Sequence, residues 1–132
     1  KIQKALGNLK DKKIAVWGLA FKPKTDDIRD APAITIVENL INLGARVSAF
    51  DPVARANFIK ILPSVKFYDD AVDACRGADA LVICTEWDEF RQIDLARVKK
   101  SLRRPIIIDG RNVYEPATMR KLGFKYYSVG RP

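Results

Sequence analysis

The stretch Lys13-Ile14-Ala15-Val16-Trp17-Gly18 decides the fold, because its residues 14–17 form an apolar run without alternation that a glycine follows. Such a run is typical of a strand whose two faces are both covered by helices. A long loop, residues 18–30, follows, and then a segment to Gly44 whose apolar residues recur at helical spacing. Strand, loop and helix in this order predict the first unit of an α/β sheet, with the loop at its ligand-binding edge.

The same rhythm continues to the end of the chain. Further strands are predicted at residues 46–50, 65–68, 80–85, 105–109 and 125–128, and the apolar runs at 13–18, 80–84 and 106–108 are expected to be central. The fold is therefore predicted to be α/β, with a Rossmann-like, doubly wound, mostly parallel sheet of about six strands and helices on both faces. Helices are predicted from Asp30 to Gly44, Asp51 to Pro63, Asp69 to Gly77, Asp94 to Ser101 and Pro116 to Gly123.

Length and composition limit the function. The 132 residues suit one domain, and no apolar run approaches the eighteen or so residues of a membrane helix. The net charge of +8 should attract polyanions, so both phosphorylated small ligands and nucleic acid are considered. The chain begins at Lys1 without an initiator methionine, which suggests a fragment of a longer protein.

Cysteine chemistry is weakly indicated. Two cysteines, Cys75 and Cys84, are too few for a disulfide framework in a domain of this size. The sequence contains no histidine, which is the usual base for a thiol nucleophile. A reducing, cytoplasmic setting is the simpler interpretation, with Cys84 as a small buried hydrophobe. No catalytic residue and no metal site is predicted in this chain.

Two segments carry candidate binding residues at the carboxyl edge of the predicted sheet. Lys22 and Arg29 flank the start of the first helix, where cations and backbone N–H groups could converge on one phosphate, although a salt-bridged loop is an equal interpretation. Arg111 follows Asp109 and Gly110 directly after a predicted central strand, so it should emerge at the same edge as Lys22. The alternative interpretation of this segment is a tight turn that carries a surface arginine without a binding role.

Other features of this edge favour structural interpretations. Trp87 and Phe90 follow the strand at 80–85, where aromatic residues more often complete a core or an interface than stack on a ligand. Only Gly18 is present where a dinucleotide site needs Gly-x-Gly-x-x-Gly. Asp51 could mimic the acid that binds a ribose, but Pro52 after it favours a helix cap.

Three motifs together carry a family resemblance. They are Ala20-Phe21-Lys22-Pro23-x-Thr25-Asp26-Asp27-x-Arg29, Thr85-Glu86-Trp87-x-x-Phe90 and Ile108-Asp109-Gly110-Arg111-Asn112. In this order and spacing they resemble the C-terminal, UDP-binding domain of the UDP-glucose 6-dehydrogenases, in the nucleotide-sugar dehydrogenase family. The second and third motifs favour this branch over relatives that act on GDP-mannose or UDP-N-acetylmannosamine.

The resemblance implies an enzyme that oxidises UDP-glucose to UDP-glucuronate by two hydride transfers to NAD. It implies that Phe21, Lys22 and Arg111 bind the UDP-sugar and that Arg29 contacts NAD. Residues 1–11 would be the end of a linking helix from a missing N-terminal half, and residues 12–132 the UDP-sugar-binding domain. The missing N-terminal dehydrogenase domain would hold most of NAD and the catalytic cysteine, so this chain alone is expected to be inactive. The full-length protein is expected to be a cytoplasmic homodimer, with no nucleic-acid or membrane partner.

Two other functions remain open on the sequence. A stand-alone NAD-binding module would bind NAD more tightly than UDP, and the missing glycines count against it. A nucleic-acid-binding α/β domain would show steep salt dependence, but the basic residues are dispersed and carry no interleaved aromatic pattern. A related UDP-N-acetylmannosamine or GDP-mannose dehydrogenase is the alternative within the family.

Overall fold

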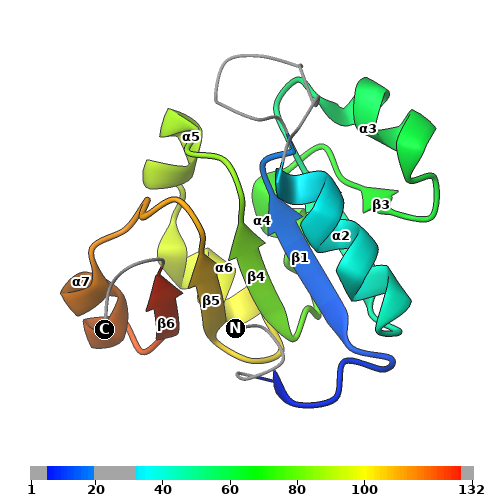
Figure 1. Ribbon diagram of the computed structural model, residues 1–132. Helices are drawn as coiled ribbons and strands as arrows, with labels where there is room; N and C mark the ends of the chain where they lie inside the picture. The colour runs from blue at the N-terminus through cyan, green and yellow to red at the C-terminus, as the bar shows by residue number, and fades with distance from the viewer. Residues whose placement is uncertain (1–5, 20–31, 129–132) are drawn as a thin grey trace.

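The computed structural model describes residues 6–19 and 32–128, which build one six-stranded sheet (Figure 1). Every strand pair is parallel, and the strand order is β3-β2-β1-β4-β5-β6. The Rossmann-like fold prediction is confirmed, and the apolar runs at β1 and β4 lie at the centre as predicted. The strands are β1 (Lys13–Trp17), β2 (Arg46–Phe50), β3 (Lys66–Phe67), β4 (Ala80–Ile83), β5 (Ile106–Asp109) and β6 (Lys125–Ser128).

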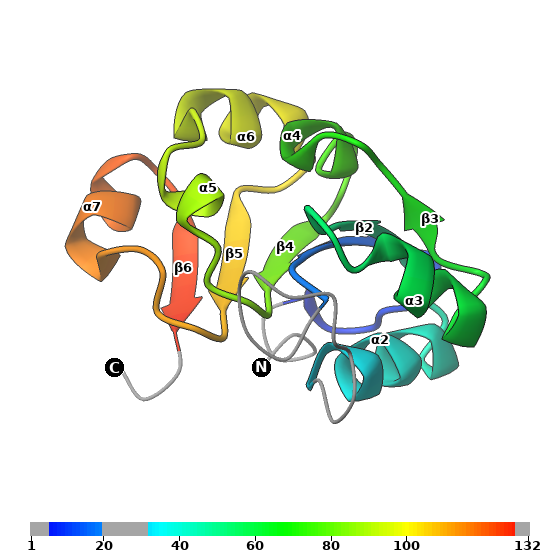
Figure 2. The same ribbon diagram turned by 90° about the horizontal axis from the view of Figure 1, so that it is seen from above.

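Helices cover both faces of this sheet, as Figure 2 shows. Helices α2 and α3 lie on one face, and α4, α5, α6 and α7 lie on the other. The short helix α5 was not predicted, because four residues are too few to show a helical period. The helices are α2 (Pro32–Asn42), α3 (Arg55–Ile61), α4 (Ala71–Ala74), α5 (Asp88–Arg91), α6 (Leu95–Ser101) and α7 (Pro116–Lys121).

The predicted helix caps have mixed outcomes. Asp94 caps α6, because its carboxylate accepts a hydrogen bond from the Ala96 N–H at 3.0 Å. The helix predicted from Asp69 corresponds to α4, and its N-cap is the adjacent Asp70. The prediction for Asp51 was wrong, because α3 begins at residue 55, beyond its reach as an N-cap. The predicted cap Asp30 lies outside the described residues.

The core consists of two apolar clusters, one on each face of the sheet. Ile14 and Val16 of β1 belong to the cluster under α2 and α3, whereas Ala15 and Trp17 belong to the cluster under α4–α7. This alternation follows from the pleat of a strand, and both sides are apolar because both are covered. The Trp17 indole N–H is satisfied by the Ala71 carbonyl at 2.9 Å.

The N-terminal segment contributes to the core. Leu6 and Leu9 are buried in the cluster under α2 and α3. Residues 1–5 lie outside the described residues, so the boundary at residue 11 stays a prediction. Among the described helices, none combines the length and apolar character needed to span a membrane.

Candidate functional site

The site lies where the carboxyl ends of β1 and β4 meet, toward the top of Figure 1. The order 3-2-1-4-5-6 reverses direction between these two strands, and ligands of such sheets bind at this switch point. Gly18 follows β1 with φ +87°, and a Cβ there would lie 2.5 Å from the Thr85 Cβ. Only glycine therefore allows the two strand ends to approach so closely.

Asp109 organises the loop after β5. Its side chain is fully buried, and Oδ1 accepts a hydrogen bond from the Arg111 backbone N–H at 2.9 Å. Oδ2 accepts hydrogen bonds from the backbone N–H of Val113 at 2.7 Å and of Tyr114 at 3.1 Å, and from the hydroxyl of Tyr126. A buried carboxylate with four donors holds the loop in one conformation.

Arg111 leaves this loop at the sheet edge, as the sequence predicted. Its Nη2 donates a hydrogen bond to Glu86 Oε1 at 3.1 Å, and the two side chains are 36% and 39% exposed. Gly110 brings the loop against β4, because its N–H donates to the Ile83 carbonyl at 2.9 Å. Arg111 is therefore a positioned, accessible cation rather than a free surface arginine.

Two polar atoms beside this ion pair are buried without partners. They are Nε1 of Trp87, the residue after Glu86, and Oδ1 of Asn112, the residue after Arg111. Neither atom has a hydrogen-bond partner among the described residues. Asn112 also has a left-handed backbone, with φ +56°. Orphaned polar atoms and left-handed residues concentrate at functional sites, and both occur here at one edge.

The remaining predicted site residues lie outside the described residues. Phe21, Lys22 and Arg29 all fall in residues 20–31, so their convergence with Arg111 stays a prediction. What the sequence missed is the anchoring of this edge by Tyr126, which is buried in β6, because nothing local distinguishes it from the exposed Tyr127 beside it. The contact between Tyr126 and Asp109 depends on the pairing of β5 with β6.

The aromatic residues after β4 belong to the core, as the structural interpretation predicted. Phe90 is fully buried, with its ring 5.1 Å from that of Trp17. Trp87 is half-buried and packs against the same cluster. The Tyr114 hydroxyl donates to the Phe90 carbonyl, which ties α5 to the Asp109 loop.

Asp51 does not resemble a ribose-binding acid. Its Oδ2 accepts a hydrogen bond from the Leu19 N–H at 2.7 Å, and Oδ1 accepts from the N–H groups of Val53 and Ala54, each at 2.8 Å. Both oxygens are thus committed to backbone groups. Asp51 fixes the turn after β2 and joins it to the end of β1.

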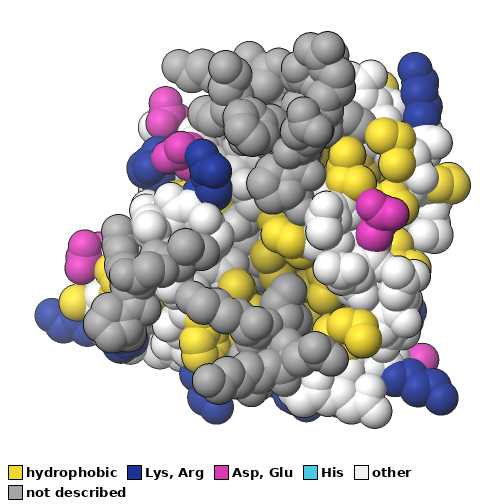
Figure 3. Space-filling view, viewed as in Figure 1, with side chains coloured by type: hydrophobic (Ala, Val, Ile, Leu, Met, Phe, Trp, Pro, Cys, Tyr) yellow, Lys and Arg dark blue, Asp and Glu magenta, His cyan; other side chains and the backbone are white. Residues whose placement is uncertain are grey.

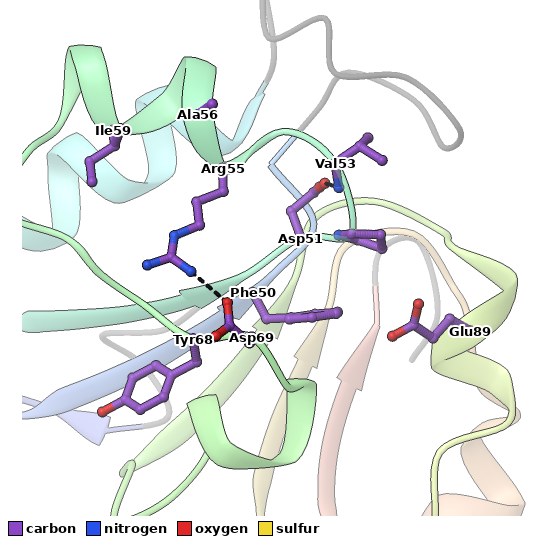
Figure 4. Close-up of a pocket in the computed structure, with 10 residues that line it drawn as sticks. Phe50, Asp51, Val53, Arg55, Ala56, Ile59, Tyr68, Asp69 and Glu89 are labelled. Carbon is purple, nitrogen blue, oxygen red and sulfur yellow. Dashed lines mark hydrogen bonds and ion pairs between the residues drawn. The ribbon is translucent and has the colours of Figure 1, made fainter.

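A pocket of about 620 Å³ lies beside this turn (Figure 4). Phe50 and Asp51 line it from the end of β2, and Arg55 from the start of α3. The Arg55 guanidinium points across the pocket and pairs with Asp69 at 2.7 Å. Both side chains are well exposed, so this pair adds little stability.

The two cysteines are poor nucleophiles. Burial raises the pKa of both the Cys75 and the Cys84 thiol to about 12. The positive charges of Lys13 near Cys75 and of Arg111 near Cys84 oppose this effect without reversing it. Within residues 6–19 and 32–128, no group of three His, Cys, Asp or Glu side chains is arranged to hold a metal ion.

The positive side chains are spread out on the face that Figure 3 shows. The described Lys and Arg side chains lie around its margin, with hydrophobic side chains between them. The described part of this face has no continuous basic track of the kind that follows a nucleic-acid backbone.

The three motifs and this fold have counterparts among known proteins. The profile of the "UDP-glucose/GDP-mannose dehydrogenase family, UDP binding domain" matches residues 15–116. The chain belongs to this family. The match includes the last three residues of β1, the switch point and the Asp109 loop, so the family resemblance stated from the motifs is confirmed.

Relatives in the family agree. The chain is 46% identical over 132 residues to UDP-glucose 6-dehydrogenase of Pseudomonas aeruginosa, covering 96% of this chain and 29% of that protein. It is 43% identical over 133 residues to UDP-glucose 6-dehydrogenase TuaD of Bacillus subtilis, covering 100% of this chain and 29% of that protein. The chain thus spans less than a third of the curated relatives that it matches.

Solved structures show the same fold. A UDP-glucose dehydrogenase from Pyrobaculum islandicum superposes with a TM-score of 0.79 at 30% identity, over 96% of this chain and 27% of that one. An NDP-N-acetyl-D-galactosaminuronic acid dehydrogenase from Methanosarcina mazei superposes with a TM-score of 0.81 at 31% identity, over 98% of this chain and 27% of that one.

Proposed function

We propose that this chain is the UDP-sugar-binding domain of an NAD-dependent UDP-glucose 6-dehydrogenase that oxidises UDP-glucose to UDP-glucuronate. The observation that carries the proposal is Arg111, an accessible cation on a fixed loop at the carboxyl edge of the sheet, inside the segment that matches the UDP binding domain of the family. Identities of 46% and 43% to UDP-glucose 6-dehydrogenases support the UDP-glucose branch.

In this proposal Arg111 holds the diphosphate of the UDP-sugar. A guanidinium suits this task because it offers several N–H donors in a plane. The Arg111 side chain donates one hydrogen bond to Glu86 and is 36% exposed. Lys22 adds a second cation to the same group, and Phe21 contacts the nucleotide sugar.

The described residues of this chain do not fit the cofactor. Asp51, where a dinucleotide fold has its ribose-binding acid, has both oxygens occupied, and Gly18 is the only glycine of the fingerprint. We therefore assign NAD mainly to an N-terminal dehydrogenase domain of the same enzyme, with Arg29 as a contact from this domain. We derive no hydride-transfer step from residues of this chain.

The proposal extends to the whole enzyme. The full-length protein would be a cytoplasmic homodimer in which the N-terminal domain supplies the catalytic cysteine. Residues 1–11 would form the end of the helix that links the two domains. We expect the 132-residue chain alone to bind UDP without oxidising UDP-glucose.

Titration calorimetry with UDP tests the site. Loss of a charged hydrogen bond costs about 1.5 to 3 kcal/mol, so Arg111→Ala should weaken UDP binding roughly ten- to a hundred-fold. Arg97→Ala is the matched control, because Arg97 is an exposed arginine on α6, away from the switch point. Equal affinity of Arg111→Ala and the parent chain would remove Arg111 from the site.

A second titration panel compares UDP, UDP-glucose, NAD and a random oligonucleotide. The proposal predicts that UDP and UDP-glucose bind more tightly than NAD. Tighter binding of NAD would favour a stand-alone NAD module. Tight oligonucleotide binding that falls by orders of magnitude with salt would favour a nucleic-acid partner.

A further inference from the structure

A second concentration of cations lies at the opposite ends of the strands from Arg111. Lys13 and Arg46 are the first residues of β1 and β2, and they are direct partners in the parallel register. Lys66 begins β3 and is the partner of Ser48 in β2. In-register residues of neighbouring strands point to the same face of a sheet. The pairing therefore gathers these side chains at the amino edge.

These residues line a pocket of about 390 Å³ at the amino edge. Among the described residues that line it, the charged ones are Lys13, Arg46 and Lys66, and none is a carboxylate. Its volume lies within the range of small-molecule sites, roughly 300 to 1,000 Å³. We call these three cations, with Ser48 and Tyr68, the amino-edge pocket.

Within the described part of the chain, the cations of the amino-edge pocket form no ion pair. The ion pairs found there do not include Lys13, Arg46 or Lys66. The Lys13 ammonium donates to the Arg76 carbonyl at 2.6 Å, a neutral acceptor. The Asp79 carboxylate accepts a hydrogen bond from the Lys13 backbone N–H at 3.0 Å.

Tyr68 reports the positive field in this pocket. Its ring lies 5.6 Å from the Lys13 Nζ and 5.3 Å from the Lys66 Nζ. Burial opposes ionisation of the phenol, but the two ammonium groups outweigh it and lower the pKa of Tyr68. A field that favours a phenolate favours any other anion at the same place.

Ser48 adds a polar side chain to this lining. The residue is only 2% exposed, and it lies in register with Lys66 in the pairing of β2 with β3. We propose that the amino-edge pocket binds the phosphate group of a small molecule, as a second anion site separate from that of Arg111.

The expected contacts follow from the chemistry of the lining. Ammonium and guanidinium groups donate charge-assisted hydrogen bonds to phosphate oxygens, and Ser48 adds a neutral donor deeper in the pocket. The proposal does not depend on the identity of the ligand at the Arg111 edge.

The test uses the ¹⁵N-labelled 132-residue chain with pyrophosphate as the probe, at low salt. Binding should saturate and should shift the amide signals of Lys13, Ser48 and Lys66. Arg111→Ala should leave this binding unchanged, whereas UDP binding should fall. Shifts confined to the Arg111 edge would overturn the second site and leave the proposed function intact.

Two variants probe the pocket itself. Lys66→Gln should weaken pyrophosphate binding about tenfold, the lower end of the range for the loss of one charged hydrogen bond. Lys125→Gln is the matched control. Lys125 is also the exposed first residue of a parallel strand, and its replacement removes the same charge. Equal losses in the two variants would reveal a general charge effect and overturn the proposal.

A neutral variant separates a built site from general attraction. Ser48→Ala preserves the charge, and we expect it to weaken pyrophosphate binding about two- to fivefold. Its spectrum without ligand should match that of the parent chain, which checks the fold. Unchanged affinity in Ser48→Ala, or equally tight binding of citrate, would exclude a phosphate site at this position.

Discussion

Arg111 at the carboxyl edge and Lys66 at the amino edge are both exposed to solvent, but their surroundings differ. Arg111 has a carboxylate partner, Glu86, and a loop that buried Asp109 holds in place. Lys66 has no carboxylate partner among the described residues, and it shares the Tyr68 ring with a second cation, Lys13. One edge has a positioned, neutralised cation, and the other has concentrated, uncompensated charge.

The difference suggests two ways of binding an anion. A positioned guanidinium gives geometric selectivity, and its ligand must compete with the internal carboxylate. Uncompensated cations give attraction with less geometric constraint, so their ligands should be less strictly selected and more sensitive to salt. The predictions below test whether the two edges differ in this manner.

The largest expected effect concerns the two thiols, one near each edge. Cys75 follows α4 at the amino edge, and Cys84 follows β4 at the carboxyl edge. A pKa near 12 in place of an ordinary value near 9 reduces the thiolate fraction at pH 8 about a thousandfold. Labelling by Ellman's reagent should therefore be slower by about that factor in the folded chain than in guanidinium chloride.

The sign of the pH dependence checks the cause. Because burial raises both pKa values, labelling of the folded chain should accelerate about tenfold per pH unit from pH 8 toward pH 11. Rapid labelling of Cys84 alone at pH 8 would mean that the Arg111 charge activates it, and the carboxyl edge would then have a reactive group.

The second effect compares a glycine from each edge. Gly18 at the carboxyl edge and Gly77 at the amino edge both have positive φ, but only Gly18 is crowded by Thr85. An alanine costs about 1 to 2 kcal/mol for the backbone at either position, and overpacking adds about 1 to 3 kcal/mol at Gly18. Urea unfolding should show a loss of about 2 to 5 kcal/mol for Gly18→Ala.

Gly77→Ala serves as the control for backbone strain, since a Cβ there meets no atom within 4 Å. Its loss should stay near 1 to 2 kcal/mol. Similar losses for both variants would show that the close approach of β1 and β4 contributes nothing beyond backbone conformation.

The elements of this fold were predictable because their signals are local. The run at residues 13–18 shows burial on both faces without any knowledge of its neighbours, and Gly44 marks the end of α2. Asp94 was identified as a cap for the same reason. Asp69 was not distinguishable from Asp70, because adjacent carboxylates offer the same chemistry and only the backbone decides between them.

The sites were less predictable because they depend on register. The bond from the Leu19 N–H to Asp51 joins residues 32 apart, and nothing local in the sequence points to it. Lys13 and Arg46 become neighbours only when β1 pairs with β2. The position of Arg111 at the sheet edge was predictable, because the carboxyl ends of parallel strands share one edge. Its partner Glu86 required the pairing of β4 with β5.

The third effect tests the anchoring that distinguishes the carboxyl edge. Tyr126→Phe removes the hydroxyl that donates to Asp109 and approaches the Tyr114 carbonyl at 3.1 Å. The expected loss is about 1 kcal/mol in the free energy of unfolding, typical of one buried hydrogen bond. Tyr127→Phe is the control, since the neighbouring Tyr127 is 38% exposed, and urea unfolding of both variants measures the difference. A larger loss in Tyr127→Phe would contradict the anchor.

The smallest effect concerns the carboxylate that neutralises Arg111. If Glu86 competes with a bound diphosphate, Glu86→Gln should tighten UDP binding, because it removes a repulsive charge beside the ligand. At a separation of roughly 6 Å in water the repulsion is about 0.7 kcal/mol, which corresponds to about threefold in affinity. Glu89→Gln makes the same charge change three residues later, away from the Arg111 ion pair, so calorimetry of the two variants isolates the contact. The difference in affinity between the two variants should shrink at high salt.

Weaker UDP binding by Glu86→Gln would instead mean that Glu86 orients Arg111 for the ligand. The two edges would then differ in whether the cation is oriented, and not in whether its charge is neutralised.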